Sequence, residues 1–151
     1  MNSWPLILVV ALGAGCTSAV RLPQVDLSQA GWRTQQGQAV WKPPGARPEI
    51  AGDLLLATNQ NGDFFVQFSK MPFTVATAEG VGRNWQIQFG AHDYHRHGHG
   101  APPDRFVWFE LPPAELGLAK GSHWKFSREP DGQWRLENAR SGETLTGRFF
   151  P

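Results

Sequence analysis

The chain has 151 residues, with 14 Lys and Arg against 13 Asp and Glu, which gives a formal net charge of +1. A balance this close to zero provides no long-range field for nucleic acid or anionic lipid, and it argues against a nucleic-acid-binding protein. Seven Trp and ten Phe supply many large apolar side chains, so length and composition suit a single domain with a substantial core.

The first sixteen residues, "MNSWPLILVVALGAGC", have the features of an export signal. The apolar run from Leu6 to Leu12 has the length of a signal-peptide core, about 7 to 15 residues, and is shorter than the roughly 20 that a spanning helix needs. Small residues then lead to Cys16, the single cysteine, which cannot form an internal disulfide. An ordinary secretory signal and an uncleaved N-terminal anchor are alternatives to a signal that ends at a lipidated cysteine.

This segment resembles a bacterial lipoprotein signal, in which small residues precede an invariant cysteine. The resemblance implies that Cys16 carries lipid, with more than one acyl chain for stable anchoring. Thr17, in place of Asp, implies the outer membrane, with the protein facing the periplasm. We therefore expect a signal peptide, a lipidated tether and an antiparallel β domain, over residues 1–15, 16–31 and 32–151.

The body of the chain reads as strands separated by Gly, Pro and Asn turn signals. Alternation of period two is clear where Phe64, Val66 and Phe68 share one face. The all-apolar "RFVWFEL" is predicted to be a strand covered on both faces, and the histidine-rich segment before it a loop. A short helix is expected over "PPAELGLAKG", which opens with proline. The nine predicted strands span residues 32–42, 51–60, 63–70, 73–80, 84–90, 105–111, 122–130, 134–139 and 144–150.

Short connections between these strands indicate an antiparallel meander rather than a parallel α/β sheet, which needs long crossovers. A sheet of this size must cover an apolar face by curling, closing or packing against a helix. The expected fold is mostly β: a single antiparallel curved sheet, an unclosed half-barrel, with one short helix. A closed lipocalin-like β-barrel is the alternative.

Several segments resemble the lipoprotein-localisation (Lol) carriers and outer-membrane receptors of Gram-negative bacteria. They are the N-terminal signal, "QQGQAVWKP", "IAGDLLLAT", and the late "ELPP" followed by a short helix and "HWKF". The resemblance covers residues 32–150 as a pattern of strands. It implies an unclosed antiparallel β-barrel whose concave apolar face is lidded by short helices and holds lipoprotein acyl chains.

The aromatic residues are the candidates for a ligand-lining surface, because a half-open trough of Trp, Phe and Leu suits an apolar ligand. The alternative is that these side chains fill the core. The residues expected to line the trough are Trp32, Trp41, Phe68, Trp85 and Trp108.

Four of the five histidines lie within "HDYHRHGH". Imidazole is a common metal ligand, so His92, His95, His97 and His99 are candidates for a weak transition-metal site. In an extended strand, however, alternate residues lie about 6 to 7 Å apart, whereas one ion needs its ligands about 2 Å away. A solvated loop that binds no metal is therefore the favoured interpretation.

No nucleophile elbow, H-E-x-x-H motif, phosphate-binding loop or Rossmann glycine set is present, so we expect no enzyme and no cofactor. Glu110 is the carboxylate of most interest, since its apolar neighbours would raise its pKa.

The expected function is non-catalytic binding of an apolar ligand, such as a lipid (palmitate, for example) or a lipoprotein acyl chain, by a membrane-anchored envelope lipoprotein. A structural or interaction lipoprotein of the cell envelope is the alternative, and an enzyme that uses the histidines as a metal site comes third. The expected partners are the membrane, reached through the lipid anchor, and the lipid or lipoprotein ligand.

Overall fold

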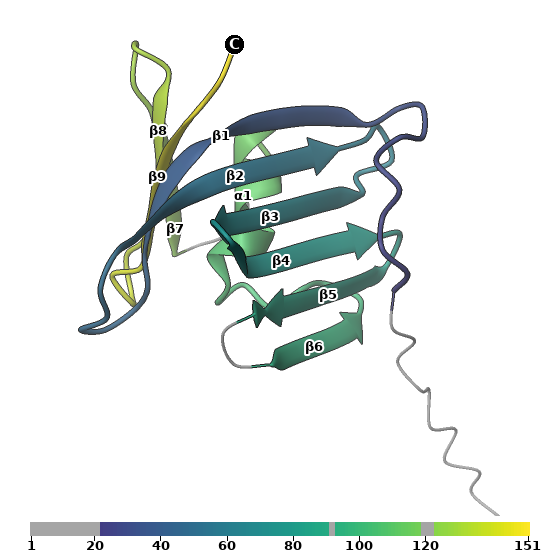
Figure 1. Cartoon of the computed structure of the whole chain (residues 1–151), viewed down its shortest axis with the longest axis horizontal. Coiled ribbons are helices and arrows are strands. Elements are labelled where there is room, and N and C mark those ends of the chain that lie inside the picture. Colours follow the sequence, from purple (N-terminus) through teal and green to yellow (C-terminus); the bar gives the residue numbers. More distant parts are fainter. Residues whose placement is uncertain (1–21, 91–92, 119–122) are drawn as a thin grey trace, which may run out of the picture.

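A computed structural model describes residues 22–90, 93–118 and 123–151 of the chain. Within these ranges, nine strands form one antiparallel sheet and a single short helix, α1, packs against it (Figure 1). The predicted mostly-β fold is confirmed. The elements are β1 Arg33–Lys42, β2 Ile50–Thr58, β3 Phe64–Lys70, β4 Phe73–Val81, β5 Asn84–Phe89, β6 Tyr94–His99, α1 Val107–Glu115, β7 Trp124–Arg128, β8 Gln133–Asn138 and β9 Thr144–Phe149.

The sheet runs in the order β6-β5-β4-β3-β2-β1-β9-β8-β7. The first six strands form a meander, and the last three return to the other side of β1, so that β1 pairs with both β2 and β9. The two groups of strands bend toward each other around α1 (Figure 1). In the described part of the chain no hydrogen-bonded pairing joins the outermost strands, β6 and β7. The half-barrel is therefore confirmed, and the closed barrel is wrong.

The segment "RFVWFEL" forms most of α1, so its prediction as a strand is wrong. The helix starts at Val107 and ends at Glu115, earlier than the predicted helical range of 112–121. An apolar run without a clear period fits a buried helix as well as a buried strand, and here the helix fills the concave face of the sheet. Its buried residues are Val107, Trp108, Phe109, Leu111, Pro112 and Ala114.

The histidine-rich segment forms the edge strand β6, so its prediction as a loop is also wrong. Alternate residues of this polar strand face the concave side. Tyr94 pairs with Phe89 of β5, and Gly98 pairs with Trp85. The indole of Trp85 lies over Gly98, where any side chain would come within 2.4 Å of the ring. The glycine is thus required by packing on the edge strand.

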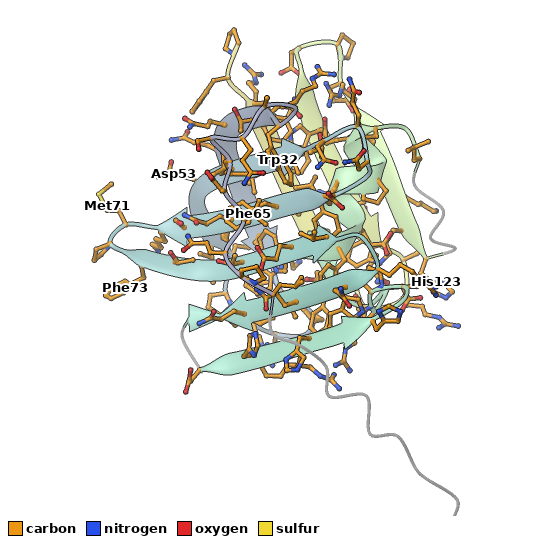
Figure 2. All side chains as sticks on the ribbon, turned by 90° about the vertical axis from the view of Figure 1, so that its right-hand side faces the viewer. Trp32, Asp53, Phe65, Met71, Phe73 and His123 are labelled. Carbon is orange, nitrogen blue, oxygen red and sulfur yellow. The ribbon has the colours of Figure 1, made fainter. Side chains whose placement is uncertain are left out.

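The segment before β1, residues 22–32, crosses the outer face of the sheet near Phe65 (Figure 2). At its start, the backbone N–H of Leu22 donates to Gln86 Oε1 over 3.1 Å, and Gln86 Nε2 donates back to the Leu22 carbonyl over 3.2 Å. The same glutamine also donates to Glu79, which is buried on this outer face. Burial raises the pKa of Glu79 despite this hydrogen bond. We call residues 22–32 the strap. Its first residue, Leu22, is held to Gln86 of β5 by the two reciprocal hydrogen bonds.

Candidate functional site

A cavity of about 910 Å³ lies at one end of the concave face. It forms where β1 and β5 end and where β2, β6 and β9 begin, because antiparallel neighbours bring these strand ends together. We call it the end pocket. Its wall is mostly apolar and consists of Trp41, Pro43, Pro44, Pro48, Ile50, Val75, Phe89, Tyr94 and Phe106.

Aromatic rings pack against one another along this wall. Trp41 and Phe89 are stacked, with ring centroids 6.1 Å apart and planes inclined by 19°. The Phe89 ring also contacts Phe106 and Tyr94, with ring centroids 6.0 Å and 5.7 Å away. Phe89, Tyr94 and Phe106 are half-buried, so part of each ring faces the open space. The wall therefore offers apolar surface to a ligand.

Polar groups line the remaining side and the mouth of the end pocket. They come from the β1–β2 connection, from the segment before α1, from the start of β7 and from the turn between β8 and β9. They are Arg47, Asp104, Arg105, His123, Asn138, Arg140, Ser141 and Glu143.

Glu143 is the most buried of these groups, with 4% of its surface exposed. Its Oε1 accepts a hydrogen bond from Trp41 Nε1 over 2.9 Å. Burial raises the pKa of Glu143 to about 7, and the bond from Trp41 opposes this increase. The wall thus contains a carboxyl group that changes charge near neutral pH.

The turn between β8 and β9 fixes the position of Glu143. Asn138 Oδ1 accepts hydrogen bonds from the backbone N–H groups of Arg140 and Ser141, over 2.9 and 3.1 Å. Ser141 Oγ in turn accepts one from the Glu143 N–H over 3.2 Å. Gly142 has a φ of 71°, a left-handed conformation that favours glycine. The buried carboxyl is therefore held by a tightly bonded turn.

The five residues that were predicted to line a trough lie in four different environments. Trp41 lines the end pocket. Phe68 and Trp108 are stacked in the centre of the core, with centroids 5.2 Å apart, and are 0% and 1% exposed. Trp85 packs edge-on against a ring of α1, and Trp32 lies on the outer face with the strap (Figure 2). Trp41 alone among the five thus lines the pocket, whereas Phe68 and Trp108 fill the core.

The histidines of β6 lie along the sheet edge. The rings of His95 and His97 are 5.3 Å apart, and His99 Nδ1 lies 3.0 Å from Asn84 Oδ1. No cluster of three or more His, Cys, Asp or Glu side chains suited to a metal ion occurs in the residues that the structure describes. His92 lies outside the described residues, as does Cys16 with the predicted signal peptide.

Glu110, the carboxyl group singled out in the sequence, lies on α1 and does not line the end pocket. Burial raises its pKa, and the negative charge of Asp104 acts in the same direction. Sequence reasoning missed Glu143, since its partner Trp41 lies 102 residues away and no local pattern connects them. A turn glutamate beside small polar residues gives no signal of burial.

A second hollow of about 420 Å³ lies at the opposite end of the sheet, between the start of β1 and the end of α1. Glu115 and Arg128 form an ion pair there. Arg33 also lines this hollow and is its one arginine without an ion pair among the described residues, against three in the end pocket.

No protein-family model matches the chain, and no curated protein is significantly similar to it. No helix in the described residues is both long enough and apolar enough to cross a bilayer. The likeness to the Lol proteins therefore stays a prediction.

Proposed function

We propose that this chain is a membrane-anchored lipoprotein of the bacterial cell envelope that binds an apolar ligand, a lipid or a lipoprotein acyl chain, without catalysis. The observation that carries the proposal is the end pocket with its aromatic wall. Its volume of about 910 Å³ falls within the range of roughly 300 to 1,000 Å³ that small-molecule sites occupy. Trp41, Phe89 and Phe106 supply apolar contact, which is the driving force for binding such a chain.

The turn between β3 and β4 supports contact with a membrane or with an apolar partner. Met71 and Phe73 are 86% and 72% exposed, and both project from this turn (Figure 2). Strand direction places the turn at the same end of the sheet as the end pocket. Neighbouring exposed apolar side chains are characteristic of interaction surfaces.

Native mass spectrometry of the full chain, extracted from bacterial envelopes without metal-affinity resin, tests the ligand. We expect a retained fatty acid or phospholipid mass. Val75→Trp should fill the pocket from β4 and reduce the retained lipid. Val40→Trp is the matched control, because Val40 points outward from β1 and is 39% exposed. A bare protein mass that takes up no added lipid would refute ligand binding.

A structural or interaction lipoprotein is the second candidate, favoured by the filling of the central concave face by α1. Trp108 and Phe68 fill space there that a larger trough would leave open. The same mass spectra decide between the two functions. If the aromatic residues only fill the core, the wild type should carry no ligand, and Val75→Trp should leave the spectrum without a change in bound species.

Anchoring is tested separately from ligand binding. Cells that express the chain are grown with radiolabelled palmitate, and the label should enter the protein and follow it to the outer-membrane fraction. Cys16→Ser should remove the label and release the protein from membranes. Label that persists in Cys16→Ser would contradict anchoring through this cysteine.

A further inference from the structure

The mouth of the end pocket carries three guanidinium groups from three separate parts of the chain. Arg47 comes from the connection between β1 and β2, Arg105 from the segment before α1, and Arg140 from the turn between β8 and β9. All three are exposed, and none forms an ion pair with any residue that the structure describes. Three elements thus bring unpaired positive charge to one opening.

The position of Arg105 connects this charge to the apolar wall. Its guanidinium carbon lies 4.7 Å from the centroid of the Phe106 ring, in a cation–π arrangement. The same Phe106 ring contacts Phe89 of the wall, with ring centroids 6.0 Å apart. A ligand that follows the wall outward therefore meets apolar surface first and a guanidinium group at the rim.

Two carboxyl groups also line the pocket, against three arginines. Asp104 lies at the rim beside Arg105, and Glu143 is buried behind Trp41. Neither carboxylate contacts an arginine of the pocket among the described residues. In the second hollow Arg128 is paired with Glu115, and Arg33 is the one lining arginine without an ion pair among the described residues. The end pocket thus differs from the second hollow in bringing three such arginines together.

We propose that the end pocket binds a single-chain amphiphile with an anionic head group, its chain against Trp41 and Phe89 and its carboxylate or phosphate among Arg47, Arg105 and Arg140. This inference rests on the proposed apolar binding function and specifies the ligand class. Guanidinium groups suit both head groups, because their planar donors match the oxygens of carboxylate and phosphate. A neutral head group would leave the three guanidinium groups without a partner of opposite charge.

The test compares ligands that share one chain and differ in the head group. The full chain with Cys16→Ser, which cannot take a thioether lipid, is titrated calorimetrically with decanoate, decyl phosphate, decanol and decyltrimethylammonium. We expect an anionic ligand to bind about tenfold more tightly than decanol, as a few exposed charge contacts would give. The relative affinity of decanoate and decyl phosphate then distinguishes a fatty acid from a phospholipid source.

Two triple variants identify the groups responsible. Arg47→Gln with Arg105→Gln and Arg140→Gln should abolish the anionic preference, measured as the ratio of the decanoate and decanol affinities of the same variant. The matched control removes the same number of positive charges from exposed residues outside the pocket: Lys70→Gln, Arg83→Gln and Arg96→Gln. It should retain the preference. Thermal unfolding of both variants checks that each is folded.

The outcomes separate the two proposals. Equal affinity for decanol and the anionic ligands, preference for the cationic one, or a preference that survives the pocket triple variant would overturn the anionic head group and leave apolar binding intact. No binding of any of the four ligands would overturn apolar binding as well. Anionic preference lost in the pocket variant and kept in the control would support both.

Discussion

The centre and the open end of the concave face are built from similar aromatic residues, yet the centre is filled and the end is hollow. The helix packs mainly against β2, β3, β4 and β8. Trp108 on the helix and Phe68 on β3 are stacked in this contact and are buried. Phe89 on β5 and Tyr94 on β6 are half-exposed. The position of the helix on the sheet, more than residue type, separates the aromatic residues of the core from those of the pocket wall.

The largest expected effect on stability is at the filled centre of the concave face. Trp108→Ala should lower the free energy of unfolding by about 3 to 5 kcal/mol, because it removes a fully buried indole and leaves a cavity. Tyr94→Ala at the open end should cost clearly less, since its ring is half-exposed. Chemical denaturation of both variants measures the difference, and equal costs would contradict the contrast between centre and end.

The pH dependence of stability should reveal the buried carboxyl of the open end. Folding raises the pKa of Glu143 from its ordinary value of 4.5 to about 7, so the folded state holds the extra proton between these values. The free energy of unfolding should therefore decrease as the pH rises from about 4.5 through 7, by at most about 3 kcal/mol.

Glu143→Gln removes this titration and retains an acceptor for Trp41 Nε1. Its stability should decrease less than that of the wild type between pH 5 and 8, as followed by thermal unfolding. Burial also raises the pKa of Glu79 and Glu110, so part of the slope should remain. A slope unchanged in the variant would contradict the raised pKa of Glu143.

An intermediate effect is expected at the edge of the concave face. Gly98→Val should destabilise the protein by about 1 to 3 kcal/mol, because the new side chain would overlap the indole of Trp85. His97→Val on the same strand faces away and is exposed, so it should change stability by less than about 0.5 kcal/mol. Urea titrations of the pair test whether β6 packs as described.

The smallest effect on stability is expected beyond the pocket, at the turn between β3 and β4. Phe73→Ser should change the free energy of unfolding by no more than about 0.5 kcal/mol, because its ring is largely exposed. If the turn contacts membranes, the same variant should reduce co-sedimentation with phospholipid vesicles. A large loss of stability would show instead that Phe73 is packed in solution.

The strands whose side chains alternate could be predicted well from the sequence. In β5 and β8, one residue in two is apolar, and the buried face follows directly. The expected total of nine strands agrees with the described fold, but two segments exchanged roles. "RFVWFEL" was predicted to be a strand but forms part of the helix, because its apolar residues show no clear period. The segment of β6 was predicted to be a loop, because its histidines make it polar.

The candidate site was harder to predict, because it depends on distances that no local pattern contains. Trp41 meets Glu143 only when β9 pairs with β1, after the chain has returned across the concave face. The hollow itself depends on where α1 begins, because Phe106, which precedes the helix, lines the wall. Residue composition could indicate an aromatic wall, but it could not tell Trp41 from Trp108.

The strap on the outer face would limit the reach of this domain if, as proposed, the chain is anchored to a membrane. Leu22 is held to Gln86 by two hydrogen bonds, so an anchor would connect to the sheet at Leu22 rather than at β1. If Cys16 carries the lipid, six Cα–Cα steps join it to Leu22, a reach of at most about 22 Å when fully extended. The domain would then stay close to the membrane that anchors it. A ligand or partner in the opposite membrane would have to be delivered to it.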